Sequence, residues 1–125
     1  MDVIRQWLSN KINNKEIGIY LKETLSVMKI AIYGAGELGE LLYDDIIGYL
    51  GLDVLYFIDK NADNLYYGID DVEILNLEEL RYAKCVDAIL ITPYQMYNQI
   101  KAELEDILDY NPLLVSLEDI IYSVE

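Results

Sequence analysis

Short apolar runs alternate with amphipathic stretches over most of the chain. Uninterrupted apolar runs bounded by turn residues predict β-strands, and apolar residues spaced three or four apart predict helices. The strands are expected at residues 29–33, 53–59, 72–75, 86–92 and 112–117. The helices are expected at residues 37–51, 77–83, 94–110 and 118–124.

This alternation of strands with helices is typical of parallel sheets with right-handed crossovers. The apolar runs lack strict alternation of polar and apolar positions, which favours strands that are covered on both faces. We therefore expect an α/β fold, a Rossmann-like open parallel sheet of about five strands in the order 3-2-1-4-5.

The first 28 residues have a helical pattern of their own. One face of the first predicted helix is apolar and carries Val3, Ile4, Trp7, Leu8 and Ile12. Asn13, followed three residues later by Glu16, predicts the cap of a second short helix. We expect an N-terminal helical segment at 1–28 and a nucleotide-binding domain at 29–125. The apolar face needs a partner, either the sheet domain or another copy of the chain, through Trp7 and Leu8.

Composition and charge narrow the class of protein. With 54% hydrophobic and 26% charged residues, the 125-residue chain is an ordinary globular protein. The net charge is −14, and residues 29–125 hold twenty acidic and five basic side chains. Such a surface repels phosphate backbones and anionic lipids, so we expect neither nucleic acid nor membrane as a partner. The single cysteine, Cys85, and a start unlike a secretory signal favour a cytoplasmic location.

A glycine motif opens the first helix of the sheet domain. Gly34, Gly36 and Gly39 have the spacing G-x-G-x-x-G directly after the first strand. In dinucleotide-binding proteins the first glycine permits a tight turn, the second lets the pyrophosphate approach, and the third lets the helix pack closely on the strand. Free N–H groups at the helix start, at Glu37 and Leu38, would hold the phosphates. The motif predicts NAD as the cofactor.

An acidic residue supports this interpretation. Asp59 ends the second strand, twenty positions after Gly39, where a carboxylate would accept the ribose hydroxyls. Two alternatives stay open, because the glycines could serve only to fit helix to strand, and Asp59 could be a turn residue. The carboxylate of Glu37 would also compete with a phosphate for the positive end of the helix. Lys60 is the one cation close to this turn in the sequence.

The end of the fourth strand lies beside the crevice where ligands bind in this class of sheet. Thr92 and Tyr94 stand there, and Tyr94 would stack on a base or on the nicotinamide ring. The alternative is a plain loop in which Pro93 ends the strand.

Longer stretches of the chain resemble a known family. They are "KIAIYGAGELGELLYDDI", "VLYFIDKNADNLYYGIDDVEILNLEEL", "VDAILIT" and "PLLVSLEDII". They are similar to the small Rossmann domains at the front of bacterial sugar-nucleotide dehydratases and epimerases and of sugar acyltransferases. The resemblance covers about 29–120 and implies a role in a nucleotide-sugar or surface-polysaccharide pathway. It puts Gly34, Gly36, Gly39 and Asp59 at the matching positions, whereas the catalytic half of those enzymes has no counterpart here.

Candidate catalytic groups are few. Tyr97 and Lys101 have the spacing Y-x-x-x-K of short-chain dehydrogenases, but they follow the fourth strand, and tyrosines and lysines are common enough for such a pair to arise by chance. Without histidine, the acidic pairs 44–45 and 70–71 predict no metal site. We assign no catalytic residue.

The function that we expect is a module that binds NAD or a sugar nucleotide and acts with a partner enzyme or as a homo-oligomer. One alternative is a minimal NAD-dependent dehydrogenase or epimerase that oligomerisation completes. Another is a structural interaction domain that binds no nucleotide.

Overall fold

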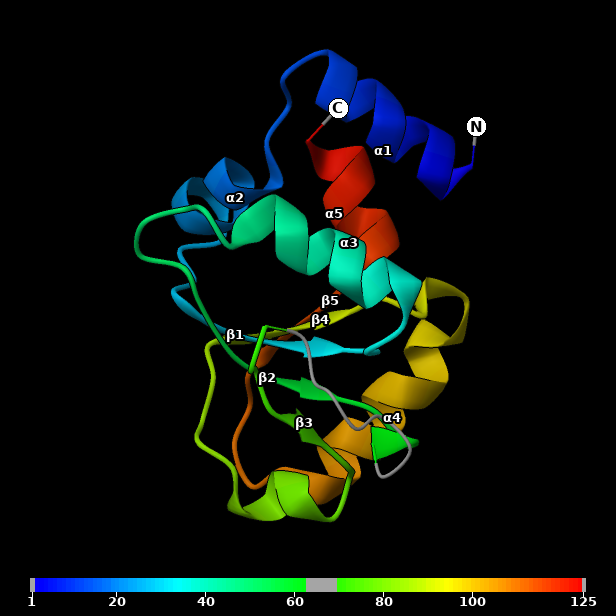
Figure 1. Cartoon of the computed structure of the whole chain (residues 1–125). Helices are drawn as coiled ribbons and strands as arrows, with labels where there is room; N and C mark the ends of the chain where they lie inside the picture. The colour runs from blue at the N-terminus through cyan, green and yellow to red at the C-terminus, as the bar shows by residue number, and fades with distance from the viewer. Residues whose placement is uncertain (1, 63–69, 125) are drawn as a thin grey trace.

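The sheet has the predicted strand order. The computed structural model describes residues 2–62 and 70–124 and contains a five-stranded parallel sheet in the order β3-β2-β1-β4-β5 (Figure 1). The prediction of a Rossmann-like α/β sheet is confirmed. The strands are β1 (Lys29–Tyr33), β2 (Asp53–Ile58), β3 (Ile74–Leu75), β4 (Ala88–Ile91) and β5 (Leu113–Ser116).

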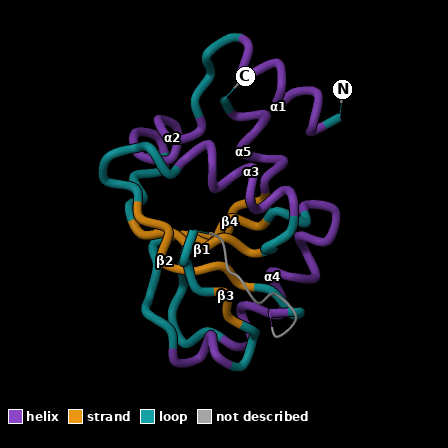
Figure 2. The backbone as a smooth tube through the Cα atoms, viewed as in Figure 1, coloured by secondary structure: helices purple, strands orange, loops and turns teal. Residues whose placement is uncertain are grey.

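Helices cover both faces of the sheet (Figure 2). The α-helices are α1 (Val3–Ile12), α2 (Ile17–Ile19), α3 (Glu37–Ile46), α4 (Tyr97–Ile107) and α5 (Leu117–Ser123). The described residues also form a π-helical turn η1 (Tyr20–Thr24) and the 3₁₀ turns η3 (Glu79–Tyr82) and η4 (Tyr94–Met96). Among the described residues, no helix is long and apolar enough to cross a lipid bilayer.

The two faces of β1 explain the two-sided core. Ile30 and Ile32 belong to the cluster that α3 and α5 cover, whereas Ala31 and Tyr33 belong to the cluster that α4 covers. Successive strand residues point to opposite faces, so a central strand with helices on both sides must be apolar throughout. The strand β1 pairs with both β2 and β4, and its glycine turn therefore lies at the middle of the sheet.

Several elements are shorter than the sequence pattern predicts. The helix expected at 37–51 ends at Ile46, and the chain then turns through Gly51, whose φ is +91°. The helix expected at 77–83 is a single 3₁₀ turn, in which Asn76 and Glu79 each accept a hydrogen bond from the other's backbone N–H. Asn13 does not cap α2, because its side chain instead donates to the carbonyl of Ser9 at the end of α1.

The N-terminal segment packs on the helical layer formed by α3 and α5 (Figure 1). Trp7 Nε1 donates to Asp45 Oδ2 at 2.6 Å, and Lys11 Nζ lies 2.9 Å from Asp45 Oδ1. Asn10 Nδ2 donates to the carbonyl of Ile121 on α5 at 2.8 Å. Trp7 is buried by these contacts and cannot mediate self-association, although Leu8 is exposed.

Candidate functional site

Gly34 makes the turn after β1 possible. Its φ is +100°, a conformation that side chains disfavour, and its N–H donates to the carbonyl of Ile58 at 2.7 Å. A Cβ at this position would stand 2.4 Å from the side-chain oxygen of Thr92. Backbone conformation and packing therefore both require glycine here.

Gly39 serves the contact between helix and strand. A Cβ on Gly39 would lie 1.9 Å from the carbonyl oxygen of Gly34, far inside the van der Waals distance. Only glycine lets α3 sit this close to the turn. The packing of this fold explains Gly39 without any ligand.

Gly36 differs from both of its neighbours in the motif. Its φ is −85°, which any residue adopts, and apart from its chain neighbours no atom of the described residues lies within 4 Å of the position that a Cβ would take. Gly36 occupies the N-cap of α3, and no side chain among the described residues caps this helix. Packing therefore leaves the glycine unexplained, and the space in front of the positive helix end is open.

Asp59 holds the glycine turn to the end of β2. Its Oδ2 accepts from the N–H of Ala35 at 2.9 Å, and its Oδ1 accepts from the N–H of Asn61 at 2.8 Å. The second contact is the one expected of a turn residue. A carboxylate has about four acceptor positions. The half-buried side chain therefore retains acceptor positions for ribose hydroxyls.

Thr92 and Tyr94 have different roles. The hydroxyl of Thr92 is buried and donates to the carbonyl of Tyr33 at 2.8 Å, so Thr92 ties β4 to β1 beneath Gly34. Tyr94 and Leu38 line a hollow of about 180 Å³ whose other walls are Thr92, Pro93, Gln95 and Met96. This hollow lies at the point where the strand order reverses, between β1 and β4.

The structure thus brings the predicted residues of the site to one edge of the sheet. Gly36 and the exposed Glu37 are at the start of α3, Leu38 and Tyr94 line the adjoining hollow, and Asp59 stands on the side of β2. Gly34, Gly39 and Thr92 lie beneath them and shape the turn.

A polar cluster that the sequence does not predict lies below Asp59. Lys60 Nζ and Glu103 Oε1 are 2.9 Å apart, although 43 positions separate the two residues. Beside them the hydroxyl of Tyr33 and Glu103 Oε2 are buried and have no hydrogen-bond partner among the described residues. Burial, and then the charges of Glu103 and Asp59, raise the pKa of Tyr33 to about 12.

The Y-x-x-x-K pair has no free phenol. Tyr97 donates its hydroxyl hydrogen to the carbonyl of Leu114 at 2.9 Å and so ties α4 to β5. This contact favours a structural role for Tyr97. The acidic pair at 44–45 is likewise used in packing, because Asp45 accepts from Trp7 and pairs with Lys11.

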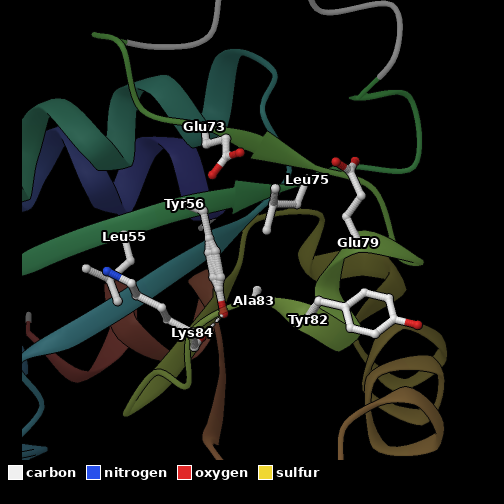
Figure 3. Close-up of a pocket in the computed structure, with 8 residues that line it drawn as sticks. All are labelled: Leu55, Tyr56, Glu73, Leu75, Glu79, Tyr82, Ala83 and Lys84. Carbon is white, nitrogen blue, oxygen red and sulfur yellow. Dashed lines mark hydrogen bonds between the residues drawn. The ribbon is translucent and has the colours of Figure 1, made fainter.

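A larger hollow of about 480 Å³ lies away from the glycine turn, against β2 and β3 (Figure 3). Its polar lining includes Glu73, Glu79 and Lys84, and the ring of Tyr82 points outward. Tyr56 donates to the carbonyl of Lys84 at 2.7 Å. Two carboxylates repel a phosphate, so size alone does not make this hollow the nucleotide site.

Comparisons with known proteins place the fold among described structures. A search of curated proteins found no match. Two solved structures are similar: the Rex-family repressor RSP, with a TM-score of 0.52, and RSP in complex with beta-NADH, with a TM-score of 0.51. Each is 18% identical over 83% of this chain. The chain spans about three fifths of their length, 61% and 62%, and at this identity the likeness shows the fold alone.

These neighbours correct one prediction. The acidic charge led us to exclude nucleic acid as a partner, yet the neighbours are repressors, a class of protein that acts on nucleic acid. The net charge of a protein is an average over its whole surface. It does not decide what one part of that surface, or another part of an assembly, binds. The exclusion of nucleic acid is therefore wrong.

One family match covers more than half of the chain. It begins shortly before β1 and ends just before β5, so it includes the glycine turn, Asp59 and the end of β4. Residues 26–112 match the family described as C2185-like, N-terminal, and the chain belongs to that family.

Proposed function

We propose that the chain is a dinucleotide-binding module whose ligand is NAD, held at the turn between β1 and α3. The observation that carries the proposal is Gly36, because no packing contact requires a glycine there and the space in front of it is open. A pyrophosphate that approaches the uncapped start of α3 would account for it. The NADH bound to the structural neighbour RSP supports the choice of ligand.

Each predicted residue has a role in this proposal. The N–H groups of Glu37 and Leu38 donate to the pyrophosphate at the helix start. Asp59 accepts the hydroxyls of the adenosine ribose with its remaining acceptor positions. Tyr94 offers its ring to the nicotinamide, the part of the cofactor that would accept or donate a hydride. The exposed carboxylate of Glu37 opposes the phosphates and keeps the affinity modest.

The experiment compares two glycines in open space. Gly36→Val puts a branched side chain where the pyrophosphate would lie. Gly48→Val makes the same change in the turn after α3, where a Cβ likewise meets no atom within 4 Å. Calorimetric titration should detect NAD binding by the wild type and by Gly48→Val, but not by Gly36→Val. A wild type that binds no NAD at millimolar concentration would refute the proposal.

A second candidate ligand is a nucleotide sugar. A hollow of about 450 Å³ shares Tyr94, Gln95 and Met96 with the smaller one and is further lined by Tyr97, Asn98, Gln99, Ser116, Glu118 and Asp119. Amides, hydroxyls and carboxylates are groups that hydrogen-bond sugar hydroxyls. With this ligand the module belongs to nucleotide-sugar or surface-polysaccharide metabolism, as the sequence resemblance implies.

Asn98→Ala separates the two ligands. The exposed Asn98 lines the larger hollow but not the smaller one next to the glycine turn. If the ligand is a nucleotide sugar, Asn98→Ala should weaken the binding of a UDP-sugar and leave that of UDP unchanged. Binding of NAD by the wild type, with no binding of any nucleotide sugar tested, would exclude this second candidate.

The module of the proposal comprises residues 29–125, with the helical segment 1–28 packed on it. A location in the cytoplasm fits its single, exposed cysteine. The proposed site offers backbone N–H groups, a carboxylate and a tyrosine ring, without an assigned acid–base pair. We therefore propose that the module works with a partner enzyme or as a homo-oligomer.

A further inference from the structure

We infer that Glu103 sets the cofactor preference of the site, because it holds Lys60 in an ion pair and so favours the ribose of NAD over the 2′-phosphorylated ribose of NADP. This inference rests on the proposed function. It concerns a residue on α4, outside the glycine motif.

The position of Lys60 gives it a potential role in cofactor choice. It directly follows Asp59, the residue proposed to accept the ribose hydroxyls. In this class of fold an acidic residue at the end of the second strand favours NAD, and a nearby cation accommodates the 2′-phosphate of NADP. The chain carries both groups side by side, so the state of Lys60 decides between the two cofactors.

Glu103 determines whether the ammonium of Lys60 is paired or free. The ammonium of Lys60 donates to Glu103 Oε1 at 2.9 Å, and the lysine side chain is 49% exposed. The side chain of Glu103 is only 28% exposed, and its Oε2 is fully buried. The carboxylate is therefore less screened by solvent than that of a surface residue, and it is held in place by the packing of α4.

The net charge of the side chains around Lys60 also disfavours the 2′-phosphate of NADP. Asp59 and Glu103 are negative and Lys60 is positive, and Tyr33 stays neutral because burial and these carboxylates raise its pKa. The cluster thus has a net charge of about −1 and repels an added phosphate. Removal of the Glu103 charge would bring the cluster to zero and release an ammonium next to the ribose.

The experiment measures affinities for NAD and NADP in matched variants. Glu103→Gln keeps the shape of the side chain and removes its charge. It should raise the affinity for NADP about fivefold or more, since a freed ammonium meets the 2′-phosphate, and change that for NAD less than about twofold. Glu105→Gln makes the same change of net charge two positions further along α4, on an exposed side chain, and should change neither affinity by more than about twofold.

Lys60→Ala completes the test. In the Glu103→Gln background it should abolish the gain for NADP. In the wild type it should lower the affinity for NADP by less than about threefold, because the ammonium already pairs with Glu103 and only the added net negative charge acts; this variant remains informative if Glu103→Gln folds poorly. A structural role of Glu103 would lower the affinities for both cofactors together and leave their ratio unchanged.

Three results would overturn the inference. The first is an equal gain for NADP in Glu103→Gln and Glu105→Gln, which would indicate a general effect of net charge. The second is an NADP affinity of the wild type that falls about tenfold with Lys60→Ala. The third is NAD binding by the wild type with no change of preference in Glu103→Gln, which leaves the proposed function intact. A wild type that binds neither cofactor removes the inference together with the proposed function.

Discussion

The two halves of the glycine turn differ in what accounts for them. Around Gly34 and Gly39 the structure is closed, since a single added methyl group would collide with Thr92 or with the backbone of the turn itself. Around Gly36 it is open, and an added methyl group would meet no neighbour in the part of the chain that the structure describes. Packing requires glycine in the closed half, whereas in the open half it does not, and there glycine is also a favoured N-cap residue. A glycine motif is therefore best interpreted one glycine at a time.

The largest expected effect concerns the closed half. Gly39→Ala should lower the free energy of unfolding by about 3 kcal/mol, because the new Cβ forces α3 away from the carbonyl of Gly34. Chemical denaturation measures the loss, with Gly48→Ala, which has open space around it, as the control. A Gly39→Ala protein as stable as that control would break the distinction between the two halves.

An intermediate effect is expected for the loss of the Asp59 carboxylate, which accepts a hydrogen bond from the glycine turn and is proposed to contact the ribose. Asp59→Ala should weaken NAD binding about ten- to a hundredfold, as expected for the loss of charge-assisted hydrogen bonds to the ribose. NADP should lose less, because the same change removes a repulsion from its 2′-phosphate. Calorimetric titration of both cofactors measures the two losses.

The same variant also tests the structural role of Asp59. The N–H groups of Ala35 and Asn61 lose their acceptor, so the free energy of unfolding should fall by about 1–2 kcal/mol. A loss of stability without any loss of NAD affinity would show that Asp59 has only a structural role, like the glycines of the closed half.

The smallest effect is expected in the open half. Gly36→Ala should lower the free energy of unfolding by only about 0.5–1 kcal/mol, because no neighbour is displaced and alanine is merely a poorer N-cap residue than glycine. The same denaturation series measures it. A destabilisation comparable to that of Gly39→Ala would show that packing also requires Gly36, and the main support for a ligand would be lost.

The sequence predicts the central part of this molecule well. β4, and β1 after the exposed Lys29, are covered on both faces and are therefore apolar, a pattern that is recognised without any knowledge of neighbours. The spacing of the three glycines likewise places the turn and the start of α3. The turn depends on residues close together in the chain, and the strand order follows from the alternation of strands and helices, which restricts the possible topologies.

Contacts between distant residues were not predictable in the same way. Lys60 and Glu103 meet only because α4 packs beneath the ends of β1 and β2, and the length of a loop does not encode that distance. How the apolar face of α1 is divided was likewise not predictable: Val3 and Trp7 are buried, whereas Ile4, Leu8 and Ile12 are exposed. A helix contacts its neighbours over a narrower strip than its apolar residues span.

Trp7 gives the protein an intrinsic optical probe. It is the single tryptophan of the chain, it is buried, and its indole donates to Asp45 on α3, the helix whose other end faces the proposed ligand. The fluorescence of an indole that is hydrogen-bonded to a carboxylate depends on where that carboxylate lies relative to the ring. A ligand that displaces α3 should therefore change the emission of the unlabelled protein at the far end of the helix, and unfolding should change it differently as water reaches the ring.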